Sequence, residues 1–121
     1  MSIVHDMLEF SIQVKLYHWQ TKVYARHVAS DSLFSNINSL IDKFVEIYIG
    51  KYERPVLNKQ QSTIKLDNHS DKAMEAYLHS WIVYLRDKLP TMLDKKDTDL
   101  LNIRDEMMGL INNTLYLFTF S

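Results

Sequence analysis

Apolar residues recur along much of this chain three or four positions apart, which is the spacing of one face of an α-helix. We expect a first helix over residues 2–24 with apolar stripes on two adjacent faces. The first stripe is Ile3, Met7, Phe10, Val14 and Tyr17, and the second is Leu8, Ile12, Leu16 and Trp19. A helix that is apolar on two faces is predicted to pack against more than one neighbour.

A second helix is predicted from about Val28 to Ile49. Its apolar stripe consists of Phe34, Ile37, Ile41, Phe44 and Tyr48. Gly50 suits the position just after a helix, and Pro55 lies a short distance beyond it. An acidic face lies about a quarter turn from the apolar stripe, so it is distinct from the core-facing side.

The remaining chain predicts two further helices. Residues 51–69 lack periodicity and read as a long link, with a turn near residues 58–62, long enough to cross from one end of a bundle to the other. A third helix begins near Ser70 or Asp71, and Pro90 ends or kinks it. A last helix follows an N-cap at Asp97 or Thr98. It carries Leu100, Ile103, Met107, Leu110, Thr114 and Phe118, and its terminal YLFTF is expected to be buried.

These elements predict an all-α fold, a ferritin-like four-helix bundle with a long link between helices 2 and 3 and a single domain over residues 1–121. Two glycines and two prolines are too few for a β-sandwich or barrel. The absence of cysteine excludes disulfides and thiolate metal sites. The formal charge of −1 gives no electrostatic case for strong DNA binding. No signal peptide or membrane span is recognisable, so a soluble, cytoplasmic protein is expected.

Two pairs of candidate metal ligands lie on the acidic face of the second predicted helix. Asp31 follows His27 by four residues, and Glu46 follows Asp42 by four, so each pair occupies adjacent turns. The midpoints of the two pairs are about 22 Å apart at 1.5 Å per residue. A single metal ion therefore cannot contact both pairs of one chain.

A second copy of this helix would bring the two pairs together. If the copies ran antiparallel across a two-fold axis near Asn36, His27 would face the partner's Glu46, and Asp31 would face the partner's Asp42. A homodimer through the second helix would then hold two equivalent clusters. Histidine and carboxylate ligands around open positions suit Fe(II), Mn(II) or Zn(II). The Glu-x-x-His signature of ferritin-like di-iron bundles does not occur in the sequence, which favours such an intersubunit site.

A purely structural interpretation of the same residues stays open. Acidic pairs at helical spacing are typical of a solvated helix face. A histidine beside a tryptophan, as at His18–Trp19, is typical of a packed ring with a satisfied hydrogen bond. His5 and His69 are expected at the surface, and His79 is expected to hydrogen-bond locally.

The segment from His18 to Glu46 resembles the ferroxidase region of the mini-ferritins, the Dps proteins. That family has a His-Trp pair, a second histidine, an acidic residue one turn later and an Asp-x-x-x-Glu pair. Here these positions are His18–Trp19, His27, Asp31, and Asp42 with Glu46. The resemblance implies an iron-binding ferroxidase that oxidises Fe(II) with peroxide or dioxygen, for iron detoxification and storage.

The resemblance also implies a ligand set. His18 with the partner's Asp42 and Glu46 would hold one iron. His27 and Asp31, with the partner's Glu46 as the bridge, would hold the second, so Asp42 and Glu46 are the predicted catalytic carboxylates. Whether such dimers assemble into a dodecameric shell stays open. The alternatives are a catalytically silent ferritin-like structural module, or a module that binds DNA or a partner through Lys51, Arg54, Lys59 and Lys65.

Overall fold

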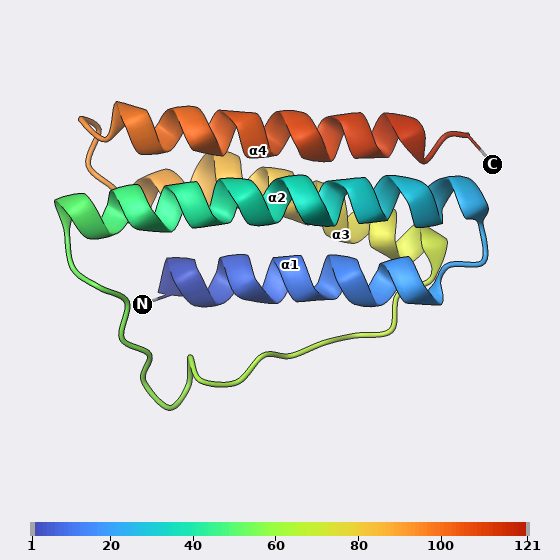
Figure 1. The fold of residues 1–121 in the computed structure, drawn as a ribbon, viewed down its shortest axis with the longest axis horizontal. Helices are drawn as coiled ribbons and strands as arrows, with labels where there is room; N and C mark the ends of the chain where they lie inside the picture. Colours follow the sequence, from blue (N-terminus) through green and yellow to red (C-terminus); the bar gives the residue numbers. More distant parts are fainter. Residues whose placement is uncertain (1, 121) are drawn as a thin grey trace.

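The computed structural model describes residues 2–120 and is all-helical (Figure 1). Its four main helices are α1 (Ser2–Gln20), α2 (Tyr24–Lys51), α3 (Asp71–Val83) and α4 (Thr98–Leu117). Within the described residues there is no β-strand. The predicted all-α class is confirmed.

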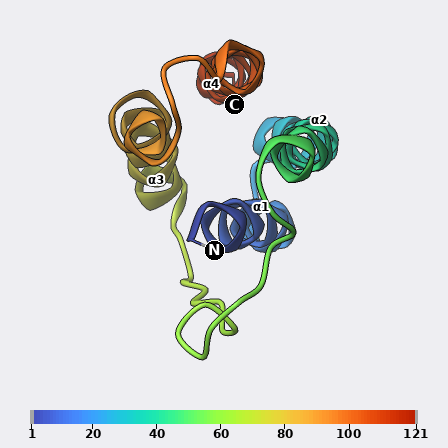
Figure 2. The ribbon, with the colours of Figure 1, turned by 90° about the vertical axis from the view of Figure 1, so that its left-hand side faces the viewer.

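The four helices lie side by side, and the link between α2 and α3 runs the length of the molecule (Figure 1). Helices α1 and α4 point one way along the long axis, and α2 and α3 point the other. Viewed from the end, α2 lies between α1 and α4, and α3 lies beside α4 (Figure 2). Two consecutive helices that point in the same direction require a crossing connection, which explains why the link is long.

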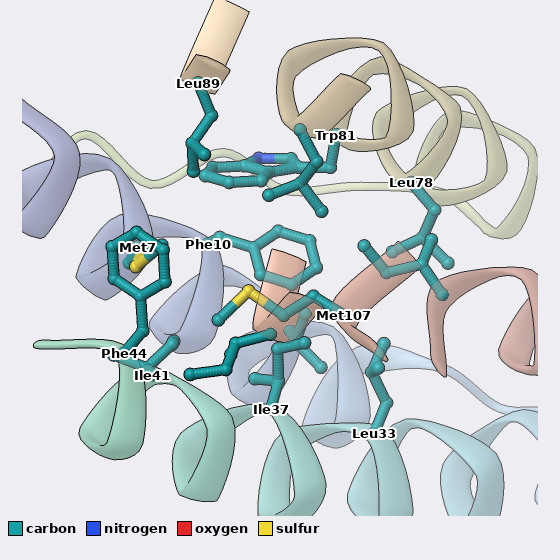
Figure 3. Packing of buried hydrophobic residues seen from close by; sticks show 14 of the residues in the cluster. Met7, Phe10, Leu33, Ile37, Ile41, Phe44, Leu78, Trp81, Leu89 and Met107 are labelled. Carbon is teal, nitrogen blue, oxygen red and sulfur yellow. The ribbon is translucent and has the colours of Figure 1, made fainter. Parts of the chain in front are cut away.

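Side chains from all four helices meet in one core (Figure 3). The first predicted stripe of α1 is buried throughout, and in α2 Ile37, Ile41 and Phe44 are buried. Helix α1 packs against two neighbours, α2 and α3, as predicted. Both neighbours cover the first stripe, however, so Leu8, Ile12 and Trp19 of the second stripe remain exposed.

The helix boundaries differ from the predicted ones at the first turn. Helix α1 ends at Gln20, and α2 begins at Tyr24, four residues earlier than expected. The intervening turn is fixed by side-chain hydrogen bonds to Asp71, which accepts from the Tyr17 hydroxyl at 2.6 Å and from the Thr21 hydroxyl at 2.9 Å. Because these bonds come from a distant helix, local capping signals did not reveal them.

Pro90 changes the helix type rather than ending the helical path. After Val83 the chain continues through a π-helical segment, η1 (Tyr84–Lys88), and a 3₁₀ segment, η2 (Leu89–Met92). Proline has no N–H to donate, and its ring crowds the carbonyl four residues earlier, so the α-helical hydrogen-bond register cannot continue. The last helix differs from its prediction near its end, where Phe118 is buried but Tyr116 and Phe120 are exposed.

The link is attached to α1 by a regular set of hydrogen bonds. His5 Nε2 lies 2.7 Å from the Thr63 carbonyl oxygen, and the Glu9 carboxylate accepts from the Lys65 N–H at 2.9 Å. Gln13 is buried, and it both donates to the Asp67 carbonyl and accepts from the Asp67 N–H. The α1 residues are four apart and the link residues are two apart. Four residues of helix rise about 6 Å and two residues of extended chain about 6.6 Å, so successive partners on α1 and on the link are equally spaced.

The histidines outside the candidate site only partly follow their predictions. His5 is half-buried rather than free at the surface, and its pKa is raised, first by the Thr63 carbonyl and then by Asp6. His69 packs its ring 5.0 Å from that of Tyr77, so it is not a simple surface residue either. His79 is exposed on α3.

The Tyr17 hydroxyl gives a first testable prediction. Replacing Tyr17 by Phe removes a buried donor to Asp71, and we expect the free energy of unfolding at neutral pH to fall by about 1–2 kcal/mol. The pKa of Asp71 is lowered, chiefly by this hydrogen bond and then by Thr21 and Arg26. A lowered carboxyl pKa contributes stability above the unfolded-state pKa near 4, and this is lost as the pH falls below it.

The difference between the wild type and the Tyr17→Phe variant should therefore be largest near neutral pH and should shrink in acid. Urea denaturation at a series of pH values measures it. A difference that stays constant down to the acid limit would show that Asp71 is not the group stabilised by the hydroxyl.

Candidate metal centre

His18 and His27 meet face to face at the turn between α1 and α2. Their ring centroids are 3.9 Å apart and the ring planes are inclined by 18°. His18 Nδ1 lies 2.6 Å from the backbone carbonyl oxygen of His27, and His27 Nδ1 lies 2.9 Å from that of His18. The two histidines are thus held by a reciprocal pair of ring-to-backbone hydrogen bonds.

This reciprocal arrangement fixes which ring nitrogens are free to bind a ligand. A carbonyl oxygen only accepts, so both Nδ1 atoms carry the proton, and each neutral ring is left with a lone pair on Nε2. Histidines that bind metal usually donate their other ring N–H to a carbonyl or carboxylate in this way. Ser30 is fully buried behind the pair and donates to the His27 carbonyl at 3.2 Å.

Asp31 lies next to the histidine pair, as predicted. Its Oδ1 atom is 3.9 Å from His18 Nε2 and accepts a hydrogen bond from Lys15 Nζ at 3.2 Å. The pKa of Asp31 is lowered, mainly by the Lys15 hydrogen bond and further by the charge of Lys15. Lys15 was not recognised in the sequence, although it lies three residues before His18 and so shares its helix face.

Asp42 and Glu46 do not join this cluster within one chain. Both are exposed, and neither makes a hydrogen bond or ion pair with a residue that the structure describes. Helix α2 is continuous from Tyr24 to Lys51, so the separation of about 22 Å between the two pairs holds. Across residues 2–120, no three histidine or acidic side chains gather closely enough to hold a metal ion.

The surface between the two half-sites is polar on α2 and apolar on α1. On α2 it contains Asn38, which accepts a hydrogen bond from Ser11 of α1 at 2.6 Å. A hollow of about 300 Å³ lies beside it, lined by Val4, Leu8, Asn38, Ile41, Asp42 and Val45. The exposed residues Leu8, Ile12 and Trp19 adjoin this surface on α1.

The fold and site thus define an all-helical protein with one preformed histidine pair. The chain belongs to the Family of unknown function (DUF5856), whose model matches residues 18–118. It is also similar to the "Uncharacterized 14.6 kDa protein in mobD-ri intergenic region" of Enterobacteria phage T4, with 39% identity over 61 residues. That match covers 50% of this chain and 48% of the phage protein, so the chain spans about half the length of this relative. No solved structure matches the chain.

The identification as a mini-ferritin (Dps) relative is wrong, because the family that matches is a different one of unknown function. The resemblance depended on six residues in a chain of 121. Histidines near a helix turn and acidic residues four apart on a solvated face meet the same spacings without common descent. The correction of the family leaves the geometry of His18, His27 and Asp31 unchanged.

Proposed function

We propose that this protein binds Fe(II) at an intersubunit site and oxidises it with peroxide or dioxygen. The observation that supports this proposal best is the histidine pair, in which both Nδ1 atoms are bonded to carbonyl oxygens and the Nε2 atom of His18 lies 3.9 Å from the carboxylate of Asp31. Two imidazoles and a carboxylate are a donor set that suits Fe(II), with Mn(II) or Zn(II) as alternatives. Iron is the substrate in this reaction, and the chain supplies the ligands that hold it.

A second copy would complete the site. In the proposed ferritin-like arrangement, the α2 helices of two chains run antiparallel, and the partner's Asp42 and Glu46 approach His18, His27 and Asp31. The exposed apolar residues Leu8, Ile12 and Trp19 beside α2 support an interface on this side. Asp31 and the partner's Asp42 carry like charges, so a bound cation would stabilise the dimer.

The oxidation follows from holding two ions together. Each of two Fe(II) ions gives one electron to one peroxide molecule, whose O–O bond breaks, and two protons are taken up to form two waters. The carboxylates hold the ions before and after they lose electrons, because hard oxygen donors also suit Fe(III). The reciprocal bonds between His18 and His27 keep both rings oriented without reorganisation.

A partner-binding module is the second candidate function. An open apolar groove lies between the start of α2 and the end of α4, where Tyr24, Val28 and Phe120 are all exposed. The DNA-binding version of this alternative is less well supported, because Lys51 is paired with Asp97 at 3.1 Å and also with Asp99. Its charge is therefore largely neutralised within the chain.

Anaerobic titration with Fe(II), followed by peroxide, tests the proposed function. We expect ferric absorbance to rise until two irons are bound per site, and His27→Ala to reduce the oxidation rate by at least about tenfold, as expected for loss of a ligand. His79→Ala is the matched control, since His79 is exposed on α3, away from the site. Absence of ferric absorbance in the wild type would exclude the ferroxidase, and equal rates in both variants would exclude His27 as a ligand.

A further inference from the structure

We propose that Lys15 is an internal counter-cation, which occupies the Asp31 carboxylate until a metal ion displaces it and which thereby sets the metal affinity of the site. The inference rests on the proposed function, because it concerns the same site. Lys15 would not bind the metal ion but would compete with it for the Asp31 carboxylate.

The position of the Lys15 ammonium group carries this inference. Nζ lies 3.2 Å from Asp31 Oδ1, and the same oxygen faces His18 Nε2 at 3.9 Å. The ammonium therefore binds the carboxylate oxygen that is directed toward the histidine pair. A metal ion coordinated by Asp31 and His18 would need that oxygen, so the ammonium and the metal ion cannot both use it in the same geometry.

The Lys15 side chain is also held from two other sides. Its Nζ lies 4.8 Å from the centroid of the Phe34 ring and 5.6 Å from that of the Trp19 ring. Cation–π contacts of this kind favour the charged ammonium near the rings. They make Lys15 a fixed neighbour of the site rather than a freely rotating surface lysine. Because its side chain is still 28% exposed, it has a path into solvent when displaced.

Two energetic terms then oppose metal binding. The first is the loss of the Lys15–Asp31 ion pair, which is modest because Asp31 is half-exposed. The second is repulsion between the ammonium and a divalent ion a few ångströms away, which decreases as salt is added. Both terms disappear when the charge is removed while the aliphatic stem is kept.

Co(II) titration followed by visible absorbance provides the test, since it reports histidine ligation without turnover. Lys15→Met should raise the Co(II) affinity of the full-length protein about tenfold at low salt. The gain should shrink at high salt. Lys15→Arg keeps the charge and should bind Co(II) as weakly as the wild type. Lys96→Met, at the opposite end of the molecule in the turn before α4, removes an equal charge and should leave the affinity unchanged.

The possible outcomes separate this inference from the proposed function. If the wild type binds Co(II), His27→Ala loses it and Lys15→Met binds no more tightly, the role of Lys15 is refuted and the metal site stands. Equal gains in Co(II) affinity for Lys15→Met and Lys96→Met would show that only the net charge matters, and this would also refute the role of Lys15. If neither the wild type nor Lys15→Met binds Co(II), the metal site itself is refuted, and the role of Lys15 with it.

Discussion

Replacing Phe10 by alanine should lower the free energy of unfolding by about 3–5 kcal/mol, a large part of the roughly 5–15 kcal/mol typical of a domain. Phe10 is only 2% exposed, and its ring lies against that of Trp81 (Figure 3). The ring centroid of Phe10 is 4.5 Å from that of Trp81 and 5.9 Å from that of Tyr77. It lines a void of about 10 Å³ together with Met7, Ile37, Ile41, Trp81, Leu85, Met107 and Ile111.

That void explains why the loss of unfolding free energy in Phe10→Ala should lie in the upper part of the range usual for such truncations. Its lining comes from α1, α2, α4 and the α3–η1 segment, so no single helix can shift to fill the space left by the ring. Truncation at Phe10 would enlarge an existing gap instead of creating a site that can collapse.

Urea denaturation followed by circular dichroism measures the effect. Phe10→Leu, which refills much of the volume, should recover part of the loss. Phe120→Ala, at a ring that is 52% exposed beyond the end of α4, should change the stability by less than about 0.5 kcal/mol. A loss below about 1 kcal/mol for Phe10→Ala would contradict the position of Phe10 at the centre of the packing.

The core was predictable from the sequence because its residues recur three or four positions apart, the spacing of one helix face. Phe10, Ile37 and Met107 were each assigned to a core stripe from spacing alone, and all three are buried. In the last helix the stripe drifts, so Ile111 is fully buried where Leu110 was expected. An α-helix has 3.6 residues per turn, so a stripe can continue either three or four residues further on. From Met107 the spacing alone therefore allows either Leu110 or Ile111 to face the core.

The attachment of the link to α1 could not be predicted in this way. Glu9 and Gln13 bind the backbone of Lys65 and Asp67 more than fifty residues away. Side chain-to-backbone bonds leave no hydrophobic pattern on the link, and the extended strand-like segment has no strand partner whose sequence could be recognised. Only the three-dimensional path of the chain brings the two matching spacings together.

The positions of the candidate residues could be predicted from the sequence in part, and their role as metal ligands stays a prediction. The structure stacks His18 on His27 and places Asp31 3.9 Å from His18. The shared face of Asp31 and Asp42 on a continuous α2 follows from helix geometry. The stacked rings and their bonds to each other's carbonyls depend on a three-residue turn over residues 21–23, which was predicted four residues further along the chain. The ion pair between Lys15 and Asp31 was not predicted from the sequence and is seen only in the structure.

Two inactive variants of this protein should restore activity to each other when they are mixed, if the site is shared between subunits. His27→Ala and Glu46→Gln each damage both sites of their own homodimer. A mixed dimer contains one intact site, formed by the histidines and Asp31 of the Glu46→Gln chain with Asp42 and Glu46 of the His27→Ala chain. Random pairing of equal amounts should therefore return about a quarter of the wild-type Fe(II) oxidation.

A second mixture serves as the control. His18→Ala combined with His27→Ala alters the same half-site in both chains, so each site of the mixed dimer still lacks one histidine, and no activity should return. The variants are unfolded together in urea and refolded jointly, so that subunits exchange fully. Because His18 is buried, circular dichroism of each variant alone is needed to show that the substitution leaves the fold intact.

The two mixtures differ only in whether the two substitutions affect opposite halves of the site or the same half. Along one α2 helix, Glu46 lies far beyond the reach of an ion bound at His27, because the helix is continuous between them. Recovery in the first mixture alone therefore requires a second chain to supply Glu46. Failure of both mixtures, with the wild type active, would place the second half of the site elsewhere and would overturn the antiparallel pairing of α2.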